Sequence, residues 1–254
     1  MADFDNRIVR GAATTADTMD AGLRAHMLRV YNYMLAGLAV TGAVAWATAN
    51  TPFGKLFYNY VQTANGSVVP QPNILGWVAF LAPLGITLWL SFRLQKMSFS
   101  AVQSAYWAIV ALMGVQLSMI MFIYTGASIA TTFFVAAAMF GGMSLFGYTT
   151  GRDLTAMGSF LIMGVWGLVI AMLVTAFFPS TNSPGIAFAI NALGVLIFTG
   201  LTAYDTQKIK QMYYYIGNGD AAAAGKASVM GAFSLYLDFY NMFLFLLRLM
   251  GNRR

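Results

Sequence analysis

The sequence contains no cysteine and no glutamate, and histidine occurs only once, at position 26. No disulfide, thiolate metal site or cysteine nucleophile can therefore form. The lone His26 also excludes a histidine-rich metal cluster. Charge of either sign is scarce, because only 9% of the residues are charged, against roughly 25% in an average soluble domain. A chain with so few charged residues cannot cover itself with polar surface.

Apolar residues make up 59% of the 254 residues. Most long segments are apolar on all sides, whereas the helices of a soluble domain would each carry a polar face. Lipid is therefore the expected solvent, and the bilayer is the first partner that the sequence predicts. The net charge is +6, but the basic residues do not gather with aromatic residues into a patch. The sequence therefore does not indicate nucleic-acid binding.

The first 23 residues differ from the rest of the chain. They combine four aspartates and two arginines with small residues and threonine, and they show no apolar core and no periodicity. We expect a flexible cytoplasmic tail over residues 1–23 and a single transmembrane domain over residues 24–254. The tail lacks the features of a cleaved signal peptide, so the first helix is expected to be a retained membrane anchor.

Seven runs of the chain are long and apolar enough to cross a bilayer, because a hydrocarbon core of about 30 Å takes about 20 helical residues. Pro83 lies inside the second run, where a membrane tolerates a bend. The connections are short, except for residues 50–73, which contain three prolines and a turn signal at residues 65–67. The sequence therefore predicts an all-α integral membrane protein with about seven transmembrane helices. The expected spans are 27–49, 74–94, 101–124, 129–150, 155–178, 184–204 with an extension to 208, and 228–250.

The basic residues indicate how the chain lies in the membrane. With a cytoplasmic N-terminus, the outer loops hold only Lys55, as the positive-inside rule requires. The C-terminus opposes this assignment, because Arg248, Arg253 and Arg254 would lie outside if the seventh run crosses completely. The seventh run therefore either crosses as a buried central helix or enters and returns on the inner side. The cations assigned to the inner side are Arg7, Arg10, Arg24, Arg29, Arg93, Lys96, Arg152, Lys208, Lys210 and Lys226.

Ionisable side chains inside apolar helices need an explanation, because each costs roughly 2.5 to 3.5 kcal/mol at a helix centre. Asp205 lies near the inner end of the sixth run, where pairing with Lys208 at the water interface would explain it. Asp238 lies on the order of 15 Å from the inner end of the seventh run, too deep for a short side chain to reach water. Asn241 and Arg248 extend a polar stripe from it. We therefore expect the seventh helix to be surrounded by the others.

If Asp205 and Asp238 face one interior, both carboxylates cannot easily ionise there, so the pair titrates as a unit. Such a pair is a pH sensor, and it can also offer oxygen ligands to Ca²⁺. Arg93, at the inner end of the second run, could pair with the ionised form and be released on protonation, which would make a gate. The alternative for Arg93 is an anchor that reaches the lipid headgroups.

Two segments resemble the Bax inhibitor-1 family, also called the transmembrane Bax-inhibitor-motif family, in its bacterial branch. They are residues 204–209, which read Tyr-Asp-Thr-Gln-Lys-Ile, and residues 234–248, which read Ser-Leu-Tyr-Leu-Asp-Phe-Tyr-Asn-Met-Phe-Leu-Phe-Leu-Leu-Arg. The resemblance implies six outer helices around a central seventh. It also implies a pH-sensitive calcium leak channel of the inner membrane, without a cofactor, whose sensor is Asp205 with Asp238.

The same resemblance assigns roles to two arginines. Arg93 looks like the family's second-helix arginine, which latches to the aspartate pair. Arg248 looks like an arginine that in some relatives meets an acidic residue on the second helix. Here the second run contains neither aspartate nor glutamate. A gating element built on that contact is therefore missing from this chain.

Two other functions fit parts of the pattern. Some bacterial relatives are associated with the regulation of membrane proteases, and contact with membrane-protein partners through apolar helix faces would need no ion path. An intramembrane aspartyl protease also carries Tyr-Asp on one helix and Asp on the next. A resemblance to that class would require Gly-x-Gly-Asp at the second aspartate, whereas residues 236–238 read Tyr-Leu-Asp. The sequence is therefore interpreted as non-enzymatic, with a contact regulator as the main alternative.

Overall fold

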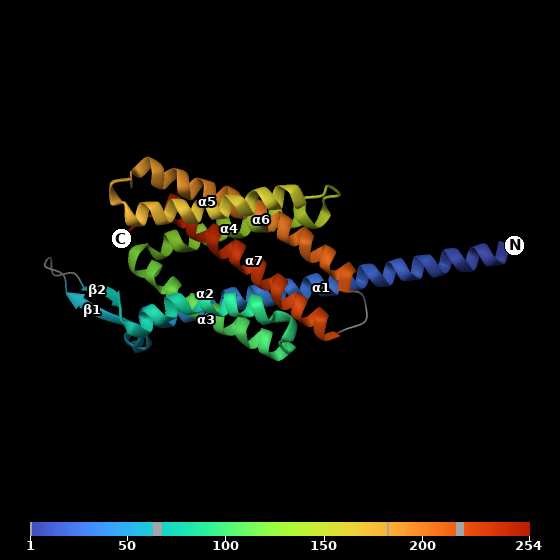
Figure 1. The fold of residues 1–254 in the computed structure, drawn as a ribbon, viewed down its shortest axis with the longest axis horizontal. Helices are drawn as coiled ribbons and strands as arrows, with labels where there is room; N and C mark the ends of the chain where they lie inside the picture. Colours follow the sequence, from blue (N-terminus) through green and yellow to red (C-terminus); the bar gives the residue numbers. More distant parts are fainter. Residues whose placement is uncertain (1, 63–67, 182, 217–220) are drawn as a thin grey trace.

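The computed structural model describes residues 2–62, 68–181, 183–216 and 221–254, and it consists almost entirely of helices (Figure 1). Within these ranges, seven helices are long and apolar enough to cross a membrane. The predicted all-α membrane fold is therefore confirmed. The helices are α1 Ala2–Asn50, α2 Ile74–Arg93, α3 Phe99–Ile123, α4 Gly126–Thr149, α5 Thr155–Phe177, α6 Pro184–Ile216 and α7 Ala221–Met250, with short 3-10 helices at Pro52–Leu56, Leu94–Lys96 and Pro179–Thr181.

Local capping signals explain where several helices begin. Asn73, Ser98 and Thr125 precede α2, α3 and α4, and each accepts a hydrogen bond from a backbone N–H of the following first turn. Polar side chains in this position replace the carbonyl partners that the first N–H groups of a helix lack. These three helices consequently begin within a few residues of the predicted spans.

Helix α1 begins much earlier than the predicted first span. Its backbone is helical from Ala2, and its first part projects beyond the rest of the bundle (Figure 1). The part that is long and apolar enough to cross a membrane begins at Ala21. Residues 2–23, within the segment expected to be a flexible tail, have a helical backbone, which the absence of proline from this stretch permits. The flexibility of the segment stays a prediction. The cytoplasmic placement of the segment stays a prediction.

The connection between α1 and α2 contains a β-hairpin that was not predicted from the sequence. Strand β1 (Tyr58–Gln62) pairs antiparallel with strand β2 (Val68–Pro72). The predicted turn at residues 65–67 lies outside the described residues. Two prolines in β2 are compatible with a hairpin of only two strands, because each strand has a free edge that needs no proline N–H.

The hairpin is anchored to the bundle by Tyr58. This side chain is only 1% exposed. Its hydroxyl donates a hydrogen bond to the Val115 carbonyl of α3 at 2.9 Å and accepts one from Ser118 at 3.2 Å. Burial raises the pKa of the Tyr58 phenol above its usual value, because the phenolate would lose its hydration. The hairpin therefore lies against α3 through a neutral, fully hydrogen-bonded hydroxyl.

Helix α7 lies at the centre of the bundle, between a group formed by α1, α2 and α3 and a group formed by α4, α5 and α6 (Figure 1). Helices α1, α3, α4 and α6 pack directly against α7, whereas α2 packs on α3 and α5 packs on α6. In the most apolar window of α7, 72% of the residues are buried, against 6% in α5. The predicted central seventh helix is confirmed, with α2 and α5 in an outer layer.

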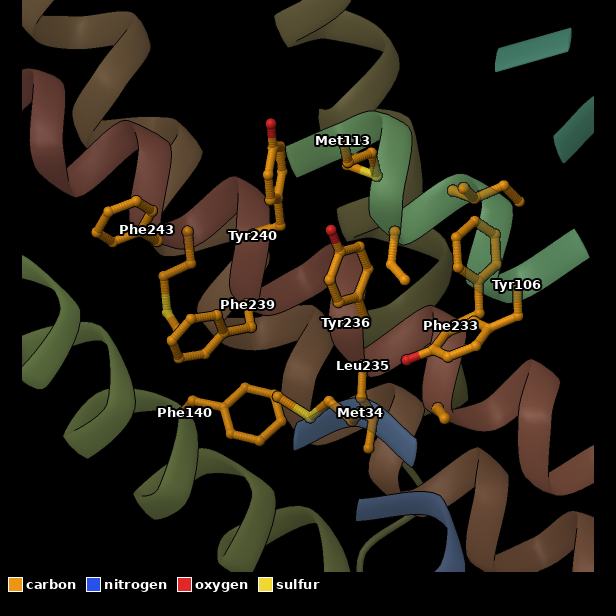
Figure 2. Packing of buried hydrophobic residues seen from close by; sticks show 14 of the residues in the cluster. Met34, Tyr106, Met113, Phe140, Phe233, Leu235, Tyr236, Phe239, Tyr240 and Phe243 are labelled. Atoms are coloured by element: carbon orange, nitrogen blue, oxygen red, sulfur yellow. The ribbon is translucent and has the colours of Figure 1, made fainter. Parts of the chain in front are cut away.

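The core around α7 is rich in aromatic side chains. Figure 2 shows Tyr236 and Tyr240 on one side of α7 and Phe239 with its neighbours on another. The Tyr236 hydroxyl is hydrogen-bonded to Thr41 Oγ1 of α1 at 2.8 Å, and Thr41 donates to the Val110 carbonyl of α3 at 2.9 Å. Buried hydroxyls need such partners. This chain of hydrogen bonds joins α7 to α1 and α3 inside an otherwise apolar core.

The C-terminal end of α7 lies at the opposite end of the bundle from the projecting part of α1 (Figure 1). Residues 251–254 are tied to the connection between α3 and α4. The Thr125 N–H donates to the Asn252 carbonyl at 3.1 Å, and the Arg254 N–H donates to the Ile123 carbonyl at 2.9 Å. Helix α7 therefore traverses the bundle and does not return. Which side of the membrane each end faces stays a prediction.

Candidate functional site

Small residues allow α6 to approach both α4 and α7 closely. A Cβ atom added to Gly147 of α4 would collide with the backbone of Ala203 in α6. A Cβ atom added to Gly231 of α7 would lie 3.0 Å from the Ile209 side chain of α6. Close backbone approach at small residues is a common basis of helix packing in membranes. The turn of α6 that carries Asp205 is consequently held between its two neighbours.

Three contacts fix the antiparallel register of α6 and α7. The residue numbers of each contacting pair sum to nearly the same value, as expected for two helices that run in opposite directions. By this register, Asp238 lies opposite the turn of α6 that holds Thr202 and Asp205. The two aspartates that the sequence singled out are therefore brought to one interface. The three contacts are Gly231 with Ile209, Met242 with Thr199, and Phe245 with Gly194.

The Asp238 carboxyl is buried in this interface. Its side chain is 4% exposed, and its Oδ2 atom has no hydrogen-bond partner within the described part of the chain. It interacts electrostatically with Asp205, which is half-buried and also interacts with Lys208 of its own helix. An ionised carboxylate that is buried without a partner is energetically costly. The arrangement is therefore suited to respond to protons and to cations.

Arg93 does not join this arrangement. It is the last residue of α2, its side chain is exposed, and α2 packs on α3. Among the described residues, the two carboxyls interact electrostatically with each other and with Lys208, and Arg93 does not contribute. The latch expected between Arg93 and the aspartate pair is not formed in this structure, because the arginine lies in the outer layer of the bundle.

The polar stripe of α7 continues from Asp238 toward the C-terminus and changes its surroundings on the way. The Asn241 amide donates to the Leu237 carbonyl of its own helix at 2.8 Å. The Arg248 guanidinium lies over the Phe245 ring at 5.7 Å. Asn241 and Arg248 both line a cavity of about 710 Å³ between α3 and α7. The stripe is thus divided between one buried acid and two groups that face a cavity.

A network of hydroxyl groups lies next to Asp205 and was not predicted from the sequence. Tyr31 of α1 is hydrogen-bonded to Ser144 of α4 at 2.6 Å, and Ser144 is hydrogen-bonded to Thr206 of α6 at 3.0 Å. Thr206 in turn donates to the Thr202 carbonyl at 2.7 Å. The partners are separated by 113 and 62 residues, so no local sequence pattern indicates them. The network joins three helices beside the aspartate pair.

The connection between α4 and α5 is bound to the same stretch of α6. Gln207 accepts a hydrogen bond from the Leu154 N–H at 2.9 Å and donates one to the Arg152 carbonyl at 2.7 Å. Asp153 in this connection is exposed, and hydrogen bonds from the hydroxyl and N–H of Thr155 lower the pKa of its carboxyl. Asp153 thus provides a solvated carboxylate, with partners of its own, in a connection that is hydrogen-bonded to α6 two residues from Asp205.

Metal binding at the pair would need ligands beyond these carboxyls. Within the described residues there is no group of three or more histidine, cysteine, aspartate or glutamate side chains that could hold a metal ion. Calcium takes 6–8 oxygen ligands, and the pair offers at most four carboxylate oxygens. Backbone carbonyls or water would have to supply the rest.

One protein family and several bacterial proteins are similar to this chain over nearly its whole length. Residues 23–254 match the family described as "Inhibitor of apoptosis-promoting Bax1". The chain is 47% identical to an uncharacterized protein of Caulobacter vibrioides, with 100% of both chains covered. It is 45% identical to an uncharacterized protein of Rickettsia prowazekii, with 93% of both chains covered.

A third relative carries information on the cellular location. The chain is 43% identical to the inner membrane protein YbhL of Escherichia coli, over 92% of this chain and 94% of that protein. Together with the seven membrane-length helices, this similarity supports a multi-pass protein of the inner membrane. None of these three names denotes an enzyme.

Proposed function

Since this chain belongs to the Bax inhibitor family of membrane proteins, we propose that it is a pH-sensitive calcium leak channel gated by Asp205 and Asp238. One observation carries the proposal. The buried Asp238 Oδ2 has no hydrogen-bond partner within the described residues, while its carboxyl interacts with Asp205 across the contact between α6 and α7. A proton shared by the two carboxyls removes the repulsion between them, and its loss restores that repulsion inside a tight helix contact.

The position of the pair connects its protonation to the rest of the bundle. Helix α6 contacts α4 at Gly147 and Ala203 and contacts α7 at Gly231. A change in the electrostatic free energy at the pair therefore acts on both contacts. In the proposed cycle, Arg93 approaches the ionised pair in a second conformation and is released by protonation, which increases flux. The exposed position of Arg93 is compatible with release in this cycle.

A cavity supports an ion route toward the pair from the C-terminal end of α7. It lies between α3 and α7, and Arg248 and Arg253 line it together with Gln116, Tyr240 and Asn241. The amide and hydroxyl oxygens of the last three are suitable ligands for a hard cation such as Ca²⁺. Asn241 lies about one helical turn from Asp238, and buried side chains occupy the space between them. These side chains must move for the ion route to open.

Calcium flux into liposomes, measured across a pH series, tests the proposal. Wild-type protein should conduct calcium with a rate that rises as the pH falls. Asp205→Asn and Asp238→Asn should each remove this dependence, because the amide keeps the shape of the side chain but exchanges no proton. Asp153→Asn is the matched control, since the asparagine amide oxygen can also accept the hydrogen bonds that Thr155 donates, and it should respond as the wild type does.

The same experiment separates the channel from its competitors. A wild-type protein without flux, or an unchanged pH response in both buried variants, would contradict the proposal. Cleavage of a membrane substrate that is lost in both buried variants would indicate an intramembrane aspartyl protease instead. If the wild-type protein shows neither flux nor cleavage, the remaining candidate is a regulator that acts through contact with membrane-protein partners.

A further inference from the structure

A second charged region lies at the C-terminal end of α7, in a cavity of about 370 Å³ between α5, α6 and α7. Arg248 and Arg253 both line this cavity, and Thr175 and Asn191 line it with neutral hydrogen-bonding groups. None of the lining residues is acidic. The same two arginines also line the larger cavity between α3 and α7, and neither cavity has an acidic residue in its lining.

The carboxylates with described side chains lie elsewhere. Asp153 lies in the connection between α4 and α5, and Asp205 and Asp238 lie in the contact between α6 and α7. Asp238 is ten residues from Arg248 along α7, or about 15 Å. The terminal residue Arg254 lines a different cavity, between α1 and α4. With no carboxylate side chain among its lining residues, the cavity at Arg248 and Arg253 is open to an anion from outside the chain.

Both arginines are held in position without such an anion. The Arg248 guanidinium lies 5.7 Å from the centre of the Phe245 ring, and the Arg253 guanidinium lies 6.0 Å from that of Tyr124. Backbone pairing between Arg253 and Tyr124 fixes the chain at this point. Stacking on an aromatic face orients a guanidinium but leaves its N–H donors available. A site prepared in this way loses little entropy when a ligand binds.

The beginning of α6 adds positive potential to the same cavity. Pro184 and Ala187, from the first turn of this 33-residue helix, are among the lining residues. A helix N-terminus favours a nearby anion through its dipole and its unpaired N–H groups. Ser183 Oγ already accepts one of these, the Ile186 N–H, at 3.3 Å. The helix end therefore supports the site, and the two arginines provide its charge.

We infer that this cavity binds the phosphate group of an anionic phospholipid. A phosphate can accept charge-assisted hydrogen bonds from two guanidinium groups at once. A lipid is favoured over a free phosphate ion because the cavity lies among exposed aromatic side chains that provide a surface for acyl chains. Phe188 lines the cavity and is 66% exposed, and Phe177 and Phe178 at the end of α5 are 76% and 61% exposed.

Lipid-dependent thermal stabilisation of the full-length protein in mixed micelles tests this inference. Phosphatidylglycerol should raise the unfolding temperature, and phosphatidylcholine with the same acyl chains should not, because its choline compensates the phosphate charge. Arg248→Gln and Arg253→Gln should each weaken the apparent affinity for phosphatidylglycerol about tenfold, as expected for the loss of one charge-assisted hydrogen bond. The control Lys55→Gln removes a cation that does not line the cavity and should keep wild-type affinity.

A conservative variant and a free anion complete the design. Changing both arginines to lysine keeps the charge but removes the planar fork, so affinity should fall between those of the wild type and the glutamine variants. Inorganic phosphate without lipid should produce no comparable stabilisation. Equal stabilisation by the two lipids would overturn the inference. So would an equal loss of affinity in Lys55→Gln, or full reproduction of the effect by inorganic phosphate.

Discussion

Helix α7 carries two charged regions that differ in their surroundings. Asp238 is 4% exposed in the contact with α6, and one of its oxygens has no partner within the described residues. Arg248 is exposed, lies over Phe245 and faces a cavity. A charge without a partner is costly in the buried contact at Asp238 and tolerated at the exposed position of Arg248. The same helix thus carries one group suited to respond to protons and another suited to bind a ligand.

The largest effect on stability should come from the close helix packing around the charged region at Asp238. Gly147→Ala would push a Cβ atom into the backbone of Ala203, so we expect a loss of about 1–3 kcal/mol in the free energy of unfolding. Gly141→Ala is the matched control in the same helix, because a Cβ atom there meets nothing within 4 Å. Denaturant titration of the helical signal measures both. Equal stability of the two variants would contradict the close α4–α6 contact.

Removal of the buried acid should stabilise the protein at the expense of function. Asp238→Leu replaces a buried carboxyl, one oxygen of which has no hydrogen-bond partner among the described residues, by an apolar side chain of similar size. We expect the free energy of unfolding to rise by about 1–3 kcal/mol, while the pH response of calcium flux is lost. The same titration checks the stability. A clear destabilisation would mean that the Asp238 carboxyl makes a favourable interaction in the folded state.

The hydroxyl network beside Asp205 should contribute less. Ser144→Ala leaves the Tyr31 and Thr206 hydroxyls without their shared partner, and we expect a loss of about 1 kcal/mol in the free energy of unfolding. Ser159→Ala is the comparison, because that exposed hydroxyl donates only to the Thr155 carbonyl of its own helix. Its loss should change stability by only a few tenths of a kcal/mol. A reversed order of the two effects would argue against the network.

The smallest effect on stability should come from the charged region at Arg248. Arg248→Gln in zwitterionic lipid should change the free energy of unfolding by less than about 0.5 kcal/mol, because the side chain is exposed and stacks on a single ring. Thermal unfolding in phosphatidylcholine nanodiscs measures this. A loss as large as that of Gly147→Ala would erase the difference between the two charged regions.

Much of the fold could be predicted because membrane helices are encoded by long local patterns. Run length and composition located the seven spans, and the depth of Asp238 with its polar stripe indicated that α7 is central. The hairpin was missed because β1 and β2 are only five residues each, and proline and glycine around them indicate only an irregular loop. The long helical backbone from Ala2 was missed because it has no apolar periodicity.

The candidate site could be predicted only in part. Asp205 and Asp238 were identified because charge is rare in apolar runs, and the structure brings them to one interface. The partners around them were not identified, since Tyr31, Ser144 and Thr206 are common in helices and meet only through tertiary packing. The expected latch from Arg93 followed from the scarcity of charge in apolar runs and from the resemblance, and the structure leaves this residue exposed in the outer layer.

The central claim is that Asp205 and Asp238 titrate as one coupled pair. Infrared difference spectra of the protonated carboxyl signal, recorded across a pH series, measure this directly in the wild type and in Asp205→Asn and Asp238→Asn. We predict that removal of either carboxyl shifts the titration of the other, so that the wild-type curve is not the sum of the two variant curves. A wild-type curve equal to that sum would contradict the account.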